Sequence, residues 1–230
     1  MLFLENKMKY IIRGILVFSL FWYSAYLQLI PIYLFHLNPH KISNSTQVLL
    51  STFSSLVICI ILFFIYRKEL KNEFLIFKKN IMENMDVAFR YWIIGLIIMM
   101  LSNFILTFFF KSGGANNEKI VQKLISSLPW LMAIDAGVIA PFNEEIVFRK
   151  ILKDIFDNKY IFIFLSVLLF GGAHVFSSAE TVLDYLYIIP YGALGGAFAC
   201  TYYKTNTIFP SMFMHMIHNT VLVLLSIIAL

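Results

Sequence analysis

Residues 88–110 read AFRYWIIGLIIMMLSNFILTFFF and contain a single charged side chain, Arg90. The hydrocarbon core of a bilayer is roughly 30 Å thick, and a helix needs about 20 predominantly apolar residues to cross it. The stretch is longer than a buried helix of a soluble protein requires. It therefore predicts a transmembrane helix.

Further apolar runs lie on both sides of this stretch, at residues 11–35, 46–66, 128–147, 160–176, 182–203 and 207–229. The run at 160–176 is short, and residues 115–127 have room for an eighth, shallow or re-entrant helix. The predicted fold class is all-α: a polytopic membrane helix bundle of about seven or eight transmembrane helices. No internal repeat or low-complexity segment is visible.

The overall composition agrees with a membrane protein. Hydrophobic residues make up 60% of the 230 positions and charged residues 13%, whereas about a quarter of a soluble globular protein is charged. The mean hydropathy is +0.80. Cys59 and Cys200 both lie inside apolar runs. We therefore expect them to be small buried hydrophobic side chains, without a disulfide or a thiol-rich metal site.

The distribution of basic residues predicts the orientation in the membrane. If the N-terminus is cytoplasmic, 14 of the 18 Lys and Arg residues fall in inner segments. The positive-inside rule therefore favours a cytoplasmic N-terminus and an outer C-terminus. The first apolar run is too long for a signal peptide and lacks a small-residue cleavage site, so we expect a retained first helix.

The net charge of +5 is explained by contact with anionic membrane lipids. No nucleic-acid partner is expected. The composition, rich in Phe and Ile, fits a multi-pass protein of a bacterial cell membrane.

Ionisable residues inside membrane helices are costly and usually serve a function. Beyond interface positions they are few: Asp135, Glu144, Glu145, His174, His215 and His218, with Asn219 beside them. We expect Asp135 to be a buried polar helix contact and leave it outside the site. No role is predicted for His218.

Residues 141–150, PFNEEIVFRK, place two carboxylates near the inner end of an apolar run. Asn143 is a candidate N-cap after Pro141, and a helix is predicted from Asn143 to about Phe156. Glu145 and Arg149 are four residues apart and can pair, while Glu144 points about 100° away and stays available for chemistry. The alternative is that both glutamates only cap a helix start.

The other candidates lie on two later helices. His174 follows Gly171, Gly172 and Ala173, small residues that let another helix approach closely. Counted from a turn near residues 158–159, Glu144 and His174 each lie roughly 21 Å up their helices, which predicts a shared depth. His215 and Asn219 share a helix face at i and i+4, with His215 about 14 Å above its own turn.

One glutamate and two histidines in a water-excluded pocket suit hydrolysis. The carboxylate can take a proton from water, and the histidines can bind a metal or stabilise an oxyanion. The alternative for each single histidine is a satisfied polar contact within the bundle.

Three short motifs carry a family resemblance: EExxxR at Glu144–Arg149, FxxxH at Phe170–His174 and HxxxN at His215–Asn219. Their order and spacing resemble the CAAX protease and bacteriocin-processing (Abi) family of intramembrane proteases. This family includes type II CAAX prenyl endopeptidases and lysostaphin-resistance-like proteins. The resemblance covers about residues 125–225, and it implies a protease domain over 115–230 after N-terminal helices without signature over 1–110.

The resemblance implies a role for each motif residue. Glu144 would activate water, Glu145 and Arg149 would hold that helix end, and His174 would orient the nucleophile. His215 and Asn219 would bind the polarised carbonyl oxygen. Zinc bound by Glu144, His174 and His215 is one alternative and metal-independent glutamate catalysis the other, because the spacing lacks the HExxH helix of soluble zinc proteases. No other cofactor is expected.

The leading hypothesis is an intramembrane (metallo-)endopeptidase that cuts a membrane-associated peptide or protein. In a bacterium the substrate would be a peptide pheromone, a bacteriocin leader or another membrane protein. The alternative from a different class is a non-catalytic immunity or scaffolding protein of the same fold that binds an envelope or signalling partner. A metal or proton transporter is disfavoured because the chain shows no inverted repeats.

Overall fold

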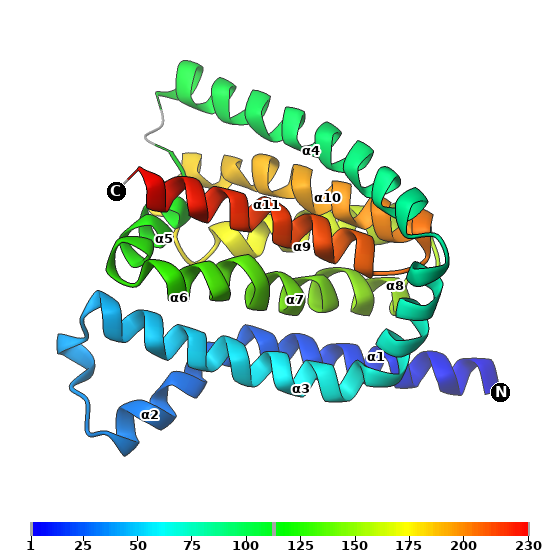
Figure 1. The fold of residues 1–230 in the computed structure, drawn as a ribbon, viewed down its shortest axis with the longest axis horizontal. Coiled ribbons are helices and arrows are strands. Elements are labelled where there is room, and N and C mark those ends of the chain that lie inside the picture. Colours follow the sequence, from blue (N-terminus) through cyan, green and yellow to red (C-terminus); the bar gives the residue numbers. More distant parts are fainter. Residues whose placement is uncertain (1, 112–113, 230) are drawn as a thin grey trace. The chain divides into compact units, whose positions relative to one another are not determined.

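The computed structural model describes residues 2–111 and 114–229, and it is built of helices with no strand among those residues. The all-α class is therefore confirmed (Figure 1). The N-terminal part contains α1 (Leu2–Trp22), η1 (Ser24–Gln28), α2 (Leu29–Leu34), η2 (Pro39–Lys41), α3 (Asn44–Lys79) and α4 (Ile81–Phe110). The remainder contains α5 (Asn116–Ser127), α6 (Pro129–Ile134), η3 (Asp135–Ile139), α7 (Ala140–Glu145), η4 (Ile146–Lys150), α8 (Ile151–Ile155), α9 (Lys159–Val175), η5 (Val182–Tyr187), α10 (Ile188–Thr205) and α11 (Phe209–Ile228).

Four helical stretches of the described chain are long and apolar enough to cross a membrane: Asn44–Lys79, Ile81–Phe110, Val182–Thr205 and Phe209–Ile228. A fifth span results if the bent pair Lys7–Trp22 and Ser24–Leu34 counts as one. The runs predicted at 128–147 and 160–176 are also helical, but the first is divided into short segments and the second is a 17-residue helix. The predicted count of seven or eight spans stays a prediction.

Large apolar side chains cover the outside of the predicted spans. On α4, Phe104 and Phe108 are 61% and 65% exposed, and only 11% of the most apolar window of this helix is buried inside the protein. In water such a surface would aggregate. An exterior of this kind is stable against lipid tails, in agreement with a membrane protein.

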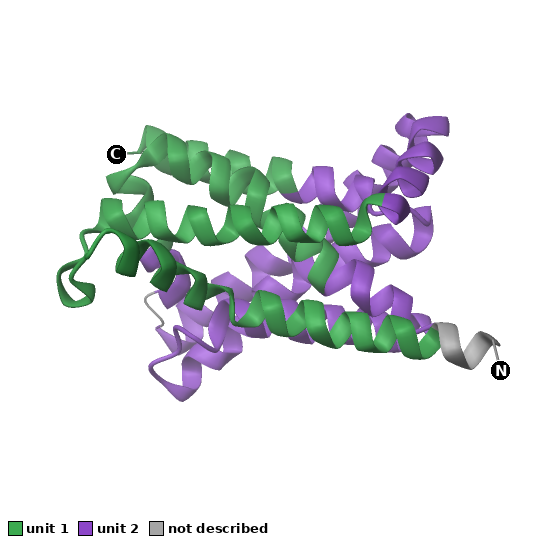
Figure 2. Ribbon diagram, turned by 90° about the horizontal axis from the view of Figure 1, so that it is seen from below, with its two compact units in different colours: residues 1–67, 121–147, 216–230 green, residues 68–120, 148–215 purple. Residues whose placement is uncertain are grey.

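The chain divides into two compact units whose segments alternate along the sequence (Figure 2). Unit 1 contains residues 1–67, 121–147 and 216–230, and unit 2 contains residues 68–120 and 148–215. The predicted division into 1–110 and 115–230 stays a prediction. Helices α3 and α11 each begin in one unit and end in the other.

In unit 2, α10 packs against both α4 and α9 (Figure 1). Small residues permit these contacts. A Cβ atom at Gly171 of α9 would lie 2.6 Å from the Ile188 carbonyl oxygen, and one at Gly95 of α4 would lie 2.7 Å from the Ala197 Cβ. The close approach predicted beside His174 is therefore present, and it brings the backbone of α10 against α9.

In unit 1, α1 and η1 pack against α3. The Arg13 guanidinium lies 4.5 Å from the centre of the Tyr66 ring, and the Ser54 hydroxyl donates a hydrogen bond of 2.6 Å to the Ser24 carbonyl. Val48, Ile125, Met132 and Val223 form a buried apolar cluster in the same unit. A second hydrogen bond, from Gln47 Nε2 of α3 to Gln28 Oε1 of η1 at 3.2 Å, makes the contact of η1 with α3 partly polar.

A buried carboxylate fastens three segments of unit 2 to one another. Glu73, at the C-terminal end of α3, accepts hydrogen bonds from the Tyr202 hydroxyl at 2.9 Å and the Ile208 backbone N–H at 2.7 Å. Its Oε1 atom also lies 3.2 Å from Lys150 Nζ, which is 2.6 Å from Asp154. Each buried charge therefore has a partner, and removing one partner would leave the other charge buried and uncompensated where the end of α3 meets α8 and α10.

Lys150 of this network differs in acidity from Lys153, whose ammonium donates a 3.2 Å hydrogen bond to the Tyr202 carbonyl. Burial lowers the pKa of Lys153 from 10.5 to about 8, although the Glu73 carboxylate favours the charged form. Burial acts in the same direction on Lys150, but Asp154 and Glu73 outweigh it and raise the pKa of that ammonium. Lys153 therefore binds fewer protons in the folded than in the unfolded chain between about pH 8 and 10.5, and its contribution to stability rises with pH over this range.

We expect acylation of the Lys153 amine, which requires the neutral form, to reach half of its maximal rate near pH 8. Lys150 is the matched control, because its raised pKa should keep its half-maximal rate above pH 10.5. Mass spectrometry of the folded protein after short exposure to an acetylating reagent gives both profiles. Each residue is compared with its own plateau, so differences in steric access cancel. Coinciding profiles would contradict the prediction.

Candidate active site

The predicted catalytic carboxylates lie on a helical path that runs from α6 through η3, α7 and η4 to α8. Segments η3 and η4 are π-helical, and the Ala140 N–H accordingly bonds to the Asp135 carbonyl, five residues earlier. Pro141 has no N–H for a helical hydrogen bond, and the preceding carbonyls of Ala136 and Gly137 accept hydrogen bonds from the side chains of Asn219 and Thr220 at 3.0 and 3.5 Å. The path therefore continues through the proline.

The predicted N-cap at Asn143 is wrong for this reason. Asn143 lies within α7, and its side-chain amide donates a 2.9 Å hydrogen bond to the Ser55 carbonyl of α3. The predicted helix end near Phe156 is close to the observed end of α8 at Ile155. The carboxylates consequently lie inside a continuous helical path, and capping a helix start does not explain them.

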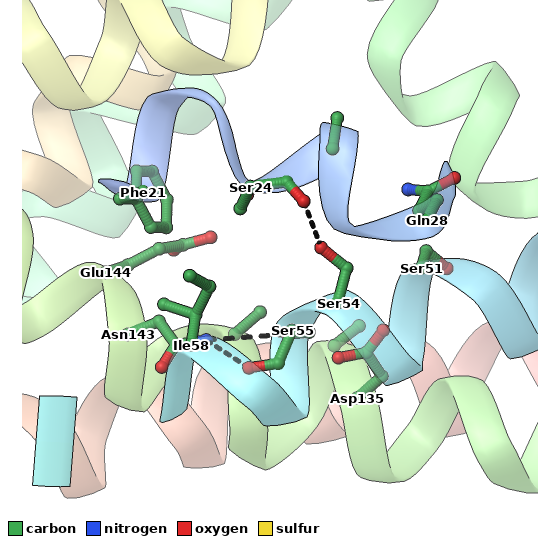
Figure 3. A pocket seen from close by; sticks show the side chains of 13 residues that line it. Phe21, Ser24, Gln28, Ser51, Ser54, Ser55, Ile58, Asp135, Asn143 and Glu144 are labelled. Atoms are coloured by element: carbon green, nitrogen blue, oxygen red, sulfur yellow. Dashed lines mark hydrogen bonds between the residues drawn. The ribbon is translucent and has the colours of Figure 1, made fainter. Parts of the chain in front are cut away.

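Glu144 lines a cavity of about 290 Å³ within unit 1 (Figure 3). The figure shows the carboxylate beside Phe21 of α1, on the side of the cavity away from Gln28. Serine hydroxyls, the amides of Gln28 and Asn143, and a second carboxylate, Asp135, also line this space. A half-buried glutamate beside a polar cavity in an otherwise apolar helix bundle can receive water.

Glu145 and Arg149 are both fully buried. Arg149 belongs to unit 2, where its guanidinium lies 4.2 Å from the centre of the Phe170 ring and 5.6 Å from that of Phe198. It also donates a long hydrogen bond of 3.5 Å to the Gly195 carbonyl. The predicted pairing of Arg149 with Glu145 stays a prediction, while the contacts with two aromatic rings identify Arg149 as part of the packing of unit 2.

His174 and His215 both contact Phe170 in unit 2. The ring centroids of His174 and Phe170 are 4.5 Å apart, and those of His215 and Phe170 are 5.6 Å apart. His174 also stacks on Tyr191 at 4.7 Å, and His215 stacks on Phe198 at 4.7 Å. The phenylalanine of the FxxxH motif thus forms a common support for the two histidines.

The contact of His174 with the backbone fixes its tautomer. Its Nδ1 atom lies 2.8 Å from the Phe170 carbonyl oxygen, and a carbonyl oxygen can only accept a hydrogen bond. In the neutral ring the hydrogen is therefore on Nδ1, and Nε2 is the acceptor. A histidine held in this way suits either a metal ligand or a hydrogen-bond acceptor for water.

Asn219 lies in unit 1 and contacts the π-helical segment η3. Its amide nitrogen donates a 3.0 Å hydrogen bond to the Ala136 carbonyl. The approach is close, because a Cβ atom at Gly137 would lie 2.6 Å from Thr220 Oγ1. An amide nitrogen carries two hydrogens, so the second remains for the predicted carbonyl-binding role. His218, on the same helix, is buried.

The structure thus groups the predicted residues by unit. Glu144, Glu145 and Asn219 belong to unit 1, and Arg149, His174 and His215 belong to unit 2. That the two groups share a depth and form one site stays a prediction. Each group is internally ordered by contacts with aromatic rings or backbone carbonyls.

Within either unit, the described residues bring no three side chains of His, Cys, Asp or Glu together as a metal site. The bonded Nδ1 of His174 leaves Nε2 as the nitrogen that would face a metal, so this residue fits a ligand role. Zinc bound by Glu144, His174 and His215 stays a prediction. Cys59 and Cys200 are free thiols of intermediate burial, less buried than predicted.

Sequence reasoning missed the polar face of α3 that lines the cavity. Ser51, Ser54 and Ser55 lie three and four residues apart, which places them on one helix face. This spacing within the apolar run 46–66 was a usable signal. The predicted buried polar contact of Asp135 is confirmed, because its Oδ2 atom, in η3, accepts a 3.1 Å hydrogen bond from Thr52 of α3.

Comparison with known proteins identifies the part of the chain that carries the motifs. Residues 126–221 match the family model described as "Type II CAAX prenyl endopeptidase Rce1-like", over the stretch for which the three motifs predicted such a resemblance. The chain is 30% identical over 116 residues to "Putative membrane peptidase YdiL" of Bacillus subtilis (strain 168), covering 49% of this chain and 44% of that protein.

A second relative, "UPF0177 protein YxdF" of Lactococcus lactis subsp. lactis (strain IL1403), is 24% identical over 143 residues, which cover 60% of this chain and 77% of the relative. No solved structure matches the chain. The match to the first relative spans less than half of that protein's length.

Proposed function

We propose that the protein is an intramembrane endopeptidase, on the premise that residues 126–221 are similar to the Rce1-like type II CAAX prenyl endopeptidases. It hydrolyses a peptide bond in a membrane-associated peptide or protein. The observation that carries the proposal is the position of Glu144 at a cavity with several polar side chains in its lining, inside a helical unit with an apolar exterior. Peptide hydrolysis in a membrane requires both a base and access for water, and this arrangement offers both.

In the proposed reaction, Glu144 takes a proton from a water molecule in the cavity as that water attacks the scissile carbonyl. The Nε2 atom of His174, left as an acceptor by the Nδ1 hydrogen bond, orients the attacking water. His215 and the second N–H of Asn219 stabilise the developing oxyanion. Glu144 then passes its proton to the leaving amine, so the carboxylate is regenerated.

Packing and hydrogen bonds hold these groups in place. Phe198 and Phe170 hold the His215 ring from two sides, and the Ala136 carbonyl fixes the Asn219 amide. Fixed donors stabilise an oxyanion without reorganising during the reaction. If zinc is bound, Glu144, His174 and His215 would hold it, and it would lower the pKa of the attacking water and polarise the carbonyl.

The proposal is tested by deleting the gene in its host and comparing the N-termini of membrane-associated peptides with those of a strain restored with the wild-type protein. We expect at least one internal N-terminus to disappear in the deletion strain and to return in the restored strain. The uncleaved precursor should accumulate in the deletion strain. In a bacterium we expect this substrate to be a peptide pheromone, a bacteriocin leader or another membrane protein. Identical sets of N-termini would contradict the proposal.

A further inference from the structure

Asp135 is a second carboxylate in the cavity and has no part in the proposed reaction. It is 8% exposed and lines the same space as Glu144. Its Oδ2 atom accepts a hydrogen bond from Thr52. Oδ1 is buried and accepts no hydrogen bond of good geometry from the described residues, although the Ser55 hydroxyl is close enough to interact with the carboxylate. A buried carboxylate with this little compensation is costly.

Three polar side chains that line the cavity, Ser51, Ser54 and Asn143, donate elsewhere and not to Asp135. The Ser51 hydroxyl donates to the Val48 carbonyl at 3.0 Å, and the Ser54 hydroxyl donates to the Ser24 carbonyl at 2.6 Å. Each hydroxyl carries a single hydrogen, so both serines present only acceptor lone pairs to the cavity. The amide nitrogen of Asn143 donates to Ser55, and its Oδ1 atom is buried without a hydrogen-bond partner among the described residues.

Neutral donors also line the cavity, since the Gln28 amide keeps its N–H groups while its Oε1 atom accepts from Gln47 at 3.2 Å. The carboxylates of Asp135 and Glu144, however, give the cavity a negative charge that these donors do not balance. No Lys, Arg or His is among the described residues that line it. A group with several hydrogen-bond donors and a positive charge complements such a space, and the ammonium of lysine and the guanidinium of arginine have these properties. A volume of about 290 Å³ accommodates either side chain.

We propose that the Asp135 end of this cavity is a subsite for a lysine or arginine side chain of the substrate. This inference rests on the proposed peptidase function. Asp135 precedes Glu144 by nine residues of helical path, which corresponds to about 14 Å. An extended peptide advances about 3.3 Å per residue, so the cationic residue lies about four residues from the cleaved bond. Figure 3 shows the two carboxylates on opposite sides of the cavity.

The first experiment measures binding without cleavage. The Glu144→Gln protein is reconstituted in phosphatidylcholine vesicles, which carry no net charge, and titrated with two fluorescent peptides that differ only by lysine or norleucine at one position. We expect the lysine peptide to bind about tenfold more tightly, since a hydrogen bond to a charged group contributes more than one to a neutral group. Equal affinities for the two peptides would overturn the inference.

Three further variants in the same background locate the preference. Asp135→Asn should reduce the ratio of the two affinities to about one, whereas Asp135→Glu, which keeps the charge, should retain a preference for lysine. Asp86→Asn is the matched control, because Asp86 lies on α4 in an exposed ion pair with Arg90. Retention of the lysine preference by a folded Asp135→Asn protein would also overturn the inference.

The second experiment uses the protein with Glu144 intact and peptides in which one lysine is moved along the sequence. We expect cleavage to follow the lysine at a spacing of about four residues. Cleavage that ignores the lysine position overturns the subsite and leaves the peptidase function standing. Absence of cleavage, combined with Asp135-dependent binding of lysine peptides, overturns the peptidase function and leaves the cation site standing.

Discussion

Replacement of Glu144 by glutamine is expected to lower the rate of peptide hydrolysis by about a thousandfold, since a positioned general base contributes about 10²–10⁴-fold. Glutamine preserves the size of the side chain and can still hydrogen-bond a water molecule, but its amide cannot take the proton. We therefore expect kcat to fall while peptide binding persists. Cleavage of the substrate found by N-terminal proteomics, measured with purified protein in vesicles, gives both quantities.

Glu83→Gln is the control for this experiment, because Glu83 is an exposed glutamate in the first turn of α4. It should cleave at the wild-type rate. Normal processing by the Glu144→Gln protein at normal abundance would rule out the proposed base. It would favour the alternative of a non-catalytic immunity or scaffolding protein, which acts by binding and tolerates an isosteric change.

Replacement of Arg149 by alanine is expected to lower the free energy of unfolding by about 3–5 kcal/mol, the range found when a large buried side chain is truncated. Arg149 is fully buried, and alanine would remove its contacts with Phe170 and Phe198 and leave a cavity between these rings. Thermal unfolding in detergent, followed by tryptophan fluorescence, measures the loss. We expect activity to fall in parallel, because Phe170 also supports His174 and His215.

Arg90→Ala is the matched control for Arg149, since the Arg90 side chain is 75% exposed and pairs with Asp86 on the surface. Its effect should stay within about 1 kcal/mol. Arg149→Lys should fall between the two, because an ammonium lacks the planar group that stacks on aromatic faces. Equal unfolding temperatures for the Arg149→Ala and Arg90→Ala proteins would show that the contacts with the aromatic rings add nothing to stability.

Features that depend on local sequence were predictable. The length of the run at 88–110 predicted α4, and the glycines before His174 predicted the close approach of another helix, which the contact of Gly171 with Ile188 confirms. The three motifs predicted the family resemblance over the stretch that matches it. These features follow from hydrophobic length, small side chains and short spacings, which neighbouring residues determine.

Features that depend on distant contacts were not predictable. The burial of Glu73 results from Tyr202 and Ile208, which lie 129 and 135 residues further along the chain. Asn143 was predicted to be an N-cap, but it donates a hydrogen bond to another helix because Ser55 of α3 lies beside it. No property of the segment 141–150 indicates that α3 is its neighbour, so reasoning from that segment alone favoured the more common local role of asparagine.

The two π-helical segments, η3 and η4, lie immediately before and after α7. A π turn holds one residue more than the α turn it replaces, and each residue of an α-helix rotates the following side chains by about 100°. Deletion of one residue within 135–139 would rotate α7 about the helix axis relative to α6, and Glu144 would then point away from its present neighbours. The number of residues in η3 and η4 therefore sets the direction in which the side chains of α7 point. Among related genes, single-residue deletions should be absent from these segments unless a nearby insertion compensates for them.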